Sequence, residues 1–279
     1  MSEIIVGFAK MGNIGSAPLI EFILDERAER EDIDVTVVGS GAKILSKQTK
    51  RVAKTVVDLG PNFIVMTTPN ASLKSPMEAM EIFKEAQIPT VVISDSPAKK
   101  ATGKIEKMGL GYIIVESDAM IGARKEFLDP VEMGLFNADI IKVLAITGVF
   151  NILSKKIDGI IESFKLNKKP NLPRVIIDRE LSISAANFQN PYAKAKALAA
   201  FELAKQVGKL NVEGCFMQKE WEQYTNTVAS AHEIMRAAAN LADEARELEK
   251  SNDSVFRTPH SSSGNLLQKR KLIEKPKKS

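Results

Sequence analysis

Cysteine and histidine are almost absent from this sequence, and their scarcity excludes several classes of protein. The 279 residues include one cysteine, Cys215, and two histidines, His232 and His260. One cysteine cannot form an internal disulfide, which fits a reducing compartment, and a four-ligand zinc site of cysteine and histidine cannot be assembled. Residues 232–236 read HEIMR, but Arg236 stands where the zinc motif HExxH has its second histidine. We therefore predict that the protein is not a metalloprotease and holds no metal.

Long hydrophobic runs are also missing. No stretch reaches the roughly 20 consecutive apolar residues that a membrane-spanning helix needs. Residues 1–3 lead directly into a strand-like run, which leaves no room for a signal peptide. We predict no contact with a membrane and a location in the cytoplasm.

Aromatic residues make up only 6% of the chain, which argues against nucleic-acid binding. The net charge is +4, and lysine and arginine collect in residues 268–279, QKRKLIEKPKKS. This tail has no interleaved aromatic residues and no recognisable reader motif, so we expect it to be solvated. The positive charge of the whole chain would favour an acidic small molecule as partner.

The first 115 residues alternate between strand-like and helix-like segments. Continuous valine and isoleucine runs indicate strands that are covered on both faces, and helices between them imply a parallel sheet with right-handed connections. The sequence predicts a doubly wound α/β fold with ligands bound outside the carboxyl ends of the strands. The expected strands are 4–9, 34–39, 62–67, 89–94 and 111–115, and the expected helices are 17–29, 47–59, 75–85 and 98–108.

Beyond this region the character of the chain changes to long helices. Asp129 and Pro130 begin a helix at 129–164 that Gly148 breaks or bends, and further helices are expected at 190–207 and 227–253. Residues 172–178 have the composition of a strand, and 254–272 that of a hairpin. We divide the chain into an α/β ligand-binding domain (1–127), a helical and oligomer-forming region (128–253), and a C-terminal β-hairpin with a basic tail (254–279).

The first turn, GNIG at 12–15, resembles a dinucleotide-binding turn only in part. Lys10 stands where the GxGxxG fingerprint has its first glycine, and the second strand ends in Gly39, Ser40 and Gly41 without the acidic residue that grips a ribose. NAD is therefore disfavoured. The turn could be a plain connection, or it could offer backbone N–H groups to another anion at a helix start.

Residues 116–142 are rich in charges of both signs and follow the fifth strand directly. They could be a solvated linker with surface ion pairs. Alternatively, Arg124 and Lys125 bind anions while Asp129 or Glu132 faces a developing cation. His260 is expected to be structural or exposed, and Cys215 is expected to be a small buried residue rather than a nucleophile.

Several sequence blocks together identify a family. They are KMGNIGSAP, LDERA, GLGYIIVESDAMIGARKEFLDPVEM, ASAHEIMRAAANLADEARELEKSND and RTPH. The chain closely resembles the coenzyme F420-dependent methylenetetrahydromethanopterin dehydrogenases of methanogenic and related archaea. The resemblance covers nearly the whole chain and is weakest at 155–173 and in the lysine tail.

The resemblance implies an oxidoreductase of one-carbon metabolism and methanogenesis. Members of this family move a hydride reversibly between methylene-tetrahydromethanopterin and the deazaflavin coenzyme F420, which acts as a co-substrate. They use neither flavin nor metal. It also implies a homohexamer built as a trimer of dimers. Two rival readings are a nicotinamide-dependent oxidoreductase on the same sheet and a non-catalytic, ligand-sensing oligomer.

Site residues are assigned by their position at strand ends within this resemblance. We expect Asp129 and Glu132 to stabilise the cation that hydride loss creates, with Asp95 and Asp118 as competing carboxylates. The predicted deazaflavin-binding residues are Lys10, Gly12, Asn13, Gly15, Ser40, Pro69 and Asn70. The predicted pterin-binding residues are Asp95, Asp118, Met120, Arg124 and Lys125.

Overall fold

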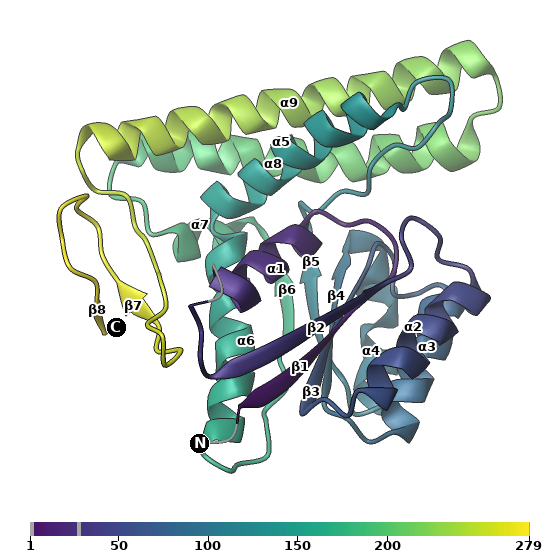
Figure 1. The fold of residues 1–279 in the computed structure, drawn as a ribbon. Helices are drawn as coiled ribbons and strands as arrows, with labels where there is room; N and C mark the ends of the chain where they lie inside the picture. Colours follow the sequence, from purple (N-terminus) through teal and green to yellow (C-terminus); the bar gives the residue numbers. More distant parts are fainter. Residues whose placement is uncertain (1–2, 27–28, 279) are drawn as a thin grey trace.

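A computed structural model describes residues 3–26 and 29–278 of the chain (Figure 1). Six parallel strands form one sheet in the order β2-β1-β3-β4-β5-β6. The strands are β1 (Ile4–Lys10), β2 (Ile33–Gly39), β3 (Phe63–Thr68), β4 (Thr90–Asp95), β5 (Gly111–Val115) and β6 (Arg174–Ile177). The predicted parallel sheet is confirmed, and each of its five expected strands lies within about a residue of its predicted bounds.

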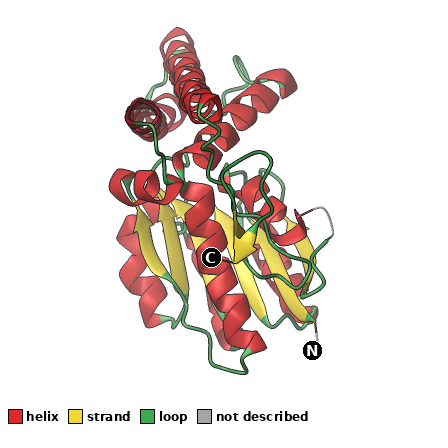
Figure 2. Ribbon diagram, turned by 90° about the vertical axis from the view of Figure 1, so that its left-hand side faces the viewer, coloured by secondary structure: helices red, strands yellow, loops and turns green. Residues whose placement is uncertain are grey.

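Helices cover both faces of the sheet, as the continuous apolar strands require. One face carries α2 (Ser46–Asp58), α3 (Lys74–Glu85) and α4 (Thr102–Lys107), and the other carries α1 (Ser16–Asp25) and α6 (Val149–Lys165) (Figures 1 and 2). The helix expected at 98–108 is instead a 3₁₀ helix, η2 (Ser96–Ala101), followed by α4. The helix expected at 17–29 ends at Asp25, and positions 27–28 of that prediction lie outside the described residues.

A layer of long helices lies beyond the carboxyl ends of the strands (Figure 1). It contains α5 (Pro130–Thr147), α8 (Pro191–Val212) and α9 (Trp221–Ser251). Small side chains let α8 and α9 run side by side. Those fully buried include Ala193, Ala197, Ala200, Ala204, Ala231, Ala238, Ala242 and Ala245.

Gly148 interrupts the helix predicted at 129–164, and the predicted break is confirmed. Its φ of +104° is a left-handed conformation, and α5 and α6 meet there at 73°. The bend lets α5 run in the upper layer while α6 turns down onto the sheet. Among the described residues no single helix is long and apolar enough to cross a membrane; α5 and α6 meet that test of length and composition only as a bent pair.

The middle of the chain contributes more than helices. The possible strand at 172–178 is β6, which pairs with β5 at the edge of the sheet. The sheet therefore draws one strand, and with α6 one covering helix, from the region 128–253. Two short elements were not predicted, α7 (Arg179–Ala186) and the π-helical turn η3 (Glu213–Met217).

The C-terminal hairpin is present. Antiparallel bridges join Arg257 to Lys269 and His260 to Leu266. Part of the lysine tail is ordered as well, because β7 (Leu267–Gln268) pairs with β8 (Lys277–Lys278), whose side chains are exposed. The expectation of a wholly solvated tail is corrected to this extent.

Candidate functional site

The carboxyl ends of β1, β2 and β3 bring together four of the predicted deazaflavin-binding residues. The Gly12 N–H donates to Ser40 Oγ at 3.1 Å, and the Ser40 N–H donates to the Lys10 carbonyl at 2.9 Å. Gly12 has a φ of +82°, and a Cβ there would lie 3.1 Å from Pro69. Glycine is therefore required by both conformation and space. Since the strand order reverses between β1 and β3, this edge is where an open sheet of this kind binds its ligand.

Asn13 and Asn70 flank this group, and Lys10 makes a further contact through its side chain. The Lys10 ammonium pairs with Glu21 of α1, so the positive charge is held at the strand end. The Asn70 side-chain oxygen accepts from the Ser72 N–H at 3.0 Å and thereby shapes the turn into α3. Asn13 is half-buried in the loop between β1 and α1.

Asp118 occupies the start of α1. Its two carboxylate oxygens accept from the N–H groups of Gly15 and Ser16 at 2.7 and 2.9 Å. The side chain is fully buried, and this burial raises the pKa of Asp118 to about 6 even though the backbone hydrogen bonds lower it. The anion at this helix start is thus a carboxylate of the protein itself, placed by a residue 103 positions away from Gly15. Asp118 and Gly15, predicted to contact different ligands, contact each other.

Asp95 lies close to Asp118 at the end of β4. It is 5% exposed and caps η2 by accepting from the Ser96 N–H. Burial, and secondly the charge of Asp118, raise the pKa of the Asp95 carboxyl well above its usual value. Burial therefore favours the neutral form of the Asp95 carboxyl at the end of β4.

Glu116 is a functional candidate that the strand-end reasoning did not select. Its carboxylate pairs with Lys99 of η2 and, at 2.7 Å, with Lys205 of α8. Burial raises its pKa, but the two ammonium groups outweigh burial and lower it overall. Lys99 follows the β4 end in the sequence and could have been noticed there, whereas Lys205 lies in a helix whose approach no local pattern reveals.

Three hydroxyl groups near the strand ends have no hydrogen-bond partner among the described residues. They belong to Thr67 and Thr68 at the end of β3 and to Ser117 just after β5, and all three are buried. A buried polar group without a partner costs about 1–3 kcal/mol. Polar atoms of a bound ligand or water at this edge would relieve that cost.

Arg124, predicted to bind an anion, is turned toward the helical layer. Its guanidinium donates to the carbonyls of Gly214 and Gln218 at 3.0 and 3.1 Å and lies 4.1 Å from the centre of the Tyr224 ring. These hydrogen bonds stabilise the turn between α8 and α9. Lys125 is largely exposed and pairs with Glu126 at 3.8 Å, a surface contact that contributes little to stability.

Met120 and the segment that follows it in the sequence also pack against α8. The Met120 carbonyl accepts from the Asn211 side-chain amide. A Cβ at Gly122 would lie 2.6 Å from the oxygen of that amide, so glycine lets the chain pass close to α8. The segment after β5 therefore runs from the sheet edge to the helical layer and packs against α8 on the way.

The two predicted catalytic carboxylates are neighbours at the start of α5. Asp129 is the N-cap, and its Oδ1 accepts from the Glu132 N–H at 2.7 Å. The Glu132 carboxylate in turn contacts His232 of α9, with 2.6 Å between Oε1 and Nδ1. His232 is 6% exposed, and burial lowers the pKa of its imidazole although Glu132 raises it. His232 had been considered only as a zinc ligand.

The whole chain matches a known family. The family model for methylene-5,6,7,8-tetrahydromethanopterin dehydrogenase matches residues 4–277. The chain belongs to this family of dehydrogenases. The family predicted from the sequence blocks is thereby confirmed, and with it the predicted class of enzyme, an oxidoreductase.

Individual members of the dehydrogenase family match over almost their full length. The chain is 52% identical to the F420-dependent methylenetetrahydromethanopterin dehydrogenase of Archaeoglobus fulgidus and 50% identical to that of Methanocaldococcus jannaschii; each alignment covers 97% of this chain and 98% of the relative. A solved structure of an F420-dependent methylene-tetrahydromethanopterin dehydrogenase in complex with methylene-tetrahydromethanopterin and coenzyme F420 superposes with a TM-score of 0.96. It is 45% identical in sequence, and the match covers 99% of this chain and 100% of that one.

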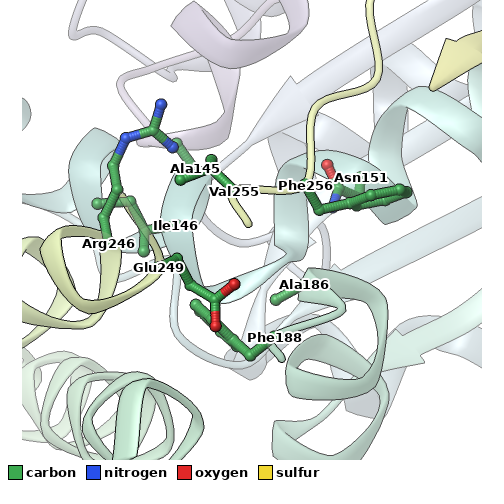
Figure 3. A pocket seen from close by; sticks show the side chains of 9 residues that line it. All are labelled: Ala145, Ile146, Asn151, Ala186, Phe188, Arg246, Glu249, Val255 and Phe256. Carbon is green, nitrogen blue, oxygen red and sulfur yellow. The ribbon is translucent and has the colours of Figure 1, made fainter. Parts of the chain in front are cut away.

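Two cavities of this dehydrogenase lie away from the strand ends. The smaller, of about 40 Å³, is shown in Figure 3 with Glu249, Arg246 and Phe256 among its lining side chains. The Glu249 carboxylate accepts from the N–H groups of Gln189 and Asn190 and from the Ser254 hydroxyl, so it serves to join α9 to the segments before α8 and after α9. The larger, of about 490 Å³, lies between α1, the α5–α6 bend and the hairpin. Neither shares a residue with the predicted site.

The donor set of the dehydrogenase is poor in metal ligands. Within residues 3–26 and 29–278, no group of three or more histidine, cysteine, aspartate or glutamate side chains is arranged to hold a metal ion. The carboxylates that do cluster are engaged otherwise, Asp118 with backbone amides and Glu116 with lysines.

Proposed function

We propose that the protein transfers a hydride reversibly between methylene-tetrahydromethanopterin and coenzyme F420, giving methenyl-tetrahydromethanopterin and reduced F420. The observation that carries this proposal is the near-complete superposition on a relative solved with both compounds. Identity of about half over the full chain in several archaeal relatives supports the same activity. A nicotinamide-dependent enzyme is not favoured, since the second strand ends without an acidic residue.

Direct hydride transfer requires the protein to hold two ring systems face to face. Such positioning can remove on the order of 7–11 kcal/mol of barrier, and it needs no nucleophile from the protein. The edge formed by the ends of β1, β2 and β3 is the proposed seat of the deazaflavin. Lys10 supplies positive charge for its anionic tail, and Asn13, Ser40, Pro69 and Asn70 line the seat.

Gly12 and Gly15 act in this proposal through the shape of the loop. Their N–H groups already donate within the protein, to Ser40 and to Asp118. Lys10 and the loop side chains therefore carry the polar contacts to the deazaflavin. The same reasoning makes Asp118 a support for this loop rather than a hydrogen-bond partner of the pterin.

Loss of the hydride leaves a delocalised cation on the pterin. A carboxylate held near that carbon would stabilise the charge as it grows. We assign this task to Glu132, with Asp129 fixing the first turn of α5. Met120, Arg124 and Lys125 belong to the segment between the sheet edge and α5, and the proposed pterin seat runs along this segment.

Assembly is also part of the proposal. We infer a homohexamer arranged as a trimer of dimers, located in the cytoplasm. Large apolar side chains stand exposed around the turn between α8 and α9, with Phe216, Met217 and Trp221 each at least 60% exposed. Apolar surface gathered in one place favours association with another chain. Analytical ultracentrifugation would detect six copies; a monomer at all concentrations would contradict the assembly without touching the activity.

One experiment tests the activity. Purified protein is mixed anaerobically with methylene-tetrahydromethanopterin and oxidised F420, and the absorbance of the oxidised deazaflavin is followed. We expect it to fall only when protein and both compounds are present. A parallel mixture with NAD in place of F420 should show no NADH formation. Reduction of NAD without reduction of F420 would establish the nicotinamide alternative, and tight binding without turnover would establish a ligand sensor.

A further inference from the structure

His232 and Glu132 form a partly buried pair between two helices. Glu132 and Phe136 lie one turn apart on α5, and His232 comes from the facing side of α9. Nδ1 of His232 lies 2.6 Å from Oε1 of Glu132. The glutamate side chain remains 30% exposed, whereas that of the histidine is only 4% exposed. The carboxylate thus has one side toward solvent and one toward a buried imidazole.

The contact fixes the tautomer of the imidazole. A carboxylate can only accept, so Nδ1 must carry the hydrogen. Nε2 is buried and has no partner among the described residues. Burial disfavours the charged imidazole, and a protonated Nε2 would leave an unsatisfied N–H in this place. Burial therefore favours a neutral imidazole whose Nδ1 donates one hydrogen bond to the Glu132 carboxylate.

Aromatic rings hold the imidazole in place. Phe127 packs edge-on against it with ring centres 4.9 Å apart, and Phe136 packs at a tilt with ring centres 4.3 Å apart. The ring has little freedom to turn away from Glu132. Among the described residues the side-chain contact of this carboxylate is made by Oε1, which leaves Oε2 open to a ligand.

We propose that His232 is a positioning residue for the hydride transfer: it anchors Oε1 of Glu132 so that the carboxylate keeps its orientation toward the cation forming on the pterin. This inference rests on the proposed function and adds a residue to it. Donors behind a functional carboxylate or metal ligand commonly change activity by about 10- to 100-fold when removed. Without the hydrogen bond from His232, the Glu132 side chain would also adopt conformations in which its carboxylate points away from the pterin.

A double-mutant cycle tests the inference. His232→Leu removes the donor, and His232→Asn keeps an N–H near the position of Nδ1. We expect kcat to fall on the order of 10- to 100-fold in His232→Leu, with KM for F420 unchanged, and to recover largely in His232→Asn. In a Glu132→Gln background, His232→Leu should cause little further loss, because the carboxylate that His232 orients is already replaced by a neutral amide. Equal losses in both backgrounds, or a wild-type kcat in His232→Leu, would overturn the proposal.

The other histidine supplies a matched control. His260 also binds carboxylates, those of Glu26 and Asp158, but it lies in the hairpin. His260→Asn should lower thermal stability and leave kcat unchanged. If His232→Leu does not fold, His232→Gln replaces it: its amide reaches toward Nε2 rather than Nδ1, so kcat should stay below that of His232→Asn. Equal kcat values for those two variants would contradict the anchor.

Failure of the proposed function would be separately visible. If the wild-type protein does not reduce F420, the proposed activity is refuted. The contact between His232 and Glu132 can then be tested by itself with nitrogen NMR of the His232 ring. The wild type should show a protonated Nδ1 and a bare Nε2, and this pattern should weaken in Glu132→Leu, which has no acceptor for the Nδ1–H. An unchanged spectrum in that variant would refute the pair itself.

Discussion

Carboxylates at the residue scale take three roles in this molecule. Asp118 faces backbone amides, Glu116 faces two lysines, and Glu132 faces a neutral histidine. Of these three, Glu132 is the one whose described side-chain contacts include neither the backbone amides of a helix start nor a lysine. That difference in surroundings, rather than the residue type, is what makes Glu132 the better candidate for stabilising a developing positive charge.

Replacing the two α5 carboxylates should lower turnover. Glu132→Gln removes the charge with little change in shape, so we expect kcat to fall on the order of 100-fold while binding of F420 stays close to wild type. Asp129→Ala removes the N-cap and should cost about 1 kcal/mol of stability in addition to a smaller loss of kcat. Steady-state kinetics with both substrates varied would measure this. Wild-type turnover in both variants would exclude the cation-stabilising role.

Asp118→Ala should destabilise the fold. It leaves the Gly15 and Ser16 N–H groups without their acceptor in a buried place, which costs about 1–3 kcal/mol in the free energy of unfolding, measured by urea denaturation. Asp178→Ala is the control, since Asp178 caps α7 at an exposed helix start and should cost only about 1 kcal/mol. A more stable Asp118→Ala would mean that burying the carboxylate costs more than its hydrogen bonds return.

At the element scale, the bend at Gly148 and the docked hairpin decide how the layers meet. The bend at Gly148 directs α6 onto the sheet. The hairpin is held by a buried chain of charges in which His260 contacts Glu26 and Asp158, Asp158 contacts Arg30, and Arg30 contacts Asp32. Both features join segments that are far apart in the sequence.

Gly148→Ala should be strongly destabilising. The residue has a φ of +104°, and a Cβ would lie 2.1 Å from the Ser182 carbonyl oxygen. Strain and overlap together should cost at least about 2 kcal/mol. Gly159→Ala, in the exposed middle of α6 with nothing near its Cβ position, should instead stabilise by up to about 1 kcal/mol. Thermal unfolding of both variants provides the comparison, and equal effects would show that the bend tolerates a side chain.

His260 should make stability depend on pH. Burial lowers its pKa, but Asp158 and Glu26 raise it more, to about 9, against a usual 6.5. Because the folded state binds the proton more tightly, the stabilisation is fully present below pH 6.5 and is lost as pH rises through about 9. The loss should reach up to about 3 kcal/mol. Urea unfolding from pH 6 to 9.5 would measure it, and His260→Gln should flatten that part of the curve; an unchanged slope would assign it to other groups.

At the scale of the whole molecule, local sequence patterns predicted the sheet well but not the contacts among the proposed site residues. Apolar runs define the strands, and the glycine, proline or polar residues that follow them mark where they end, because those signals lie within a few residues of one another. The contacts of Asp118 with Gly15 and of Glu132 with His232 join positions about a hundred residues apart. No local period encodes them, so the sequence named these side chains without revealing what they touch.

Chelation should leave catalysis intact. In the ranges that the structure describes, the histidine, cysteine and carboxylate side chains do not assemble into a metal-binding group, and hydride transfer between two bound rings needs only their positioning. Dialysis against EDTA followed by the F420 assay should therefore return full activity. A reproducible loss that is restored by one added metal would contradict the prediction that the protein holds none.

The buried carboxylate at the start of α1 bears on any redesign of the enzyme for a nicotinamide cofactor. Restoring the missing glycine at position 10 and adding an acid after β2 would recreate the dinucleotide fingerprint in the sequence. The pyrophosphate would still meet Asp118, a fixed negative group already bonded to the two amides it needs. Like charges would repel, so such a swap requires a neutral, smaller residue at position 118 before any change to the turn itself can take effect.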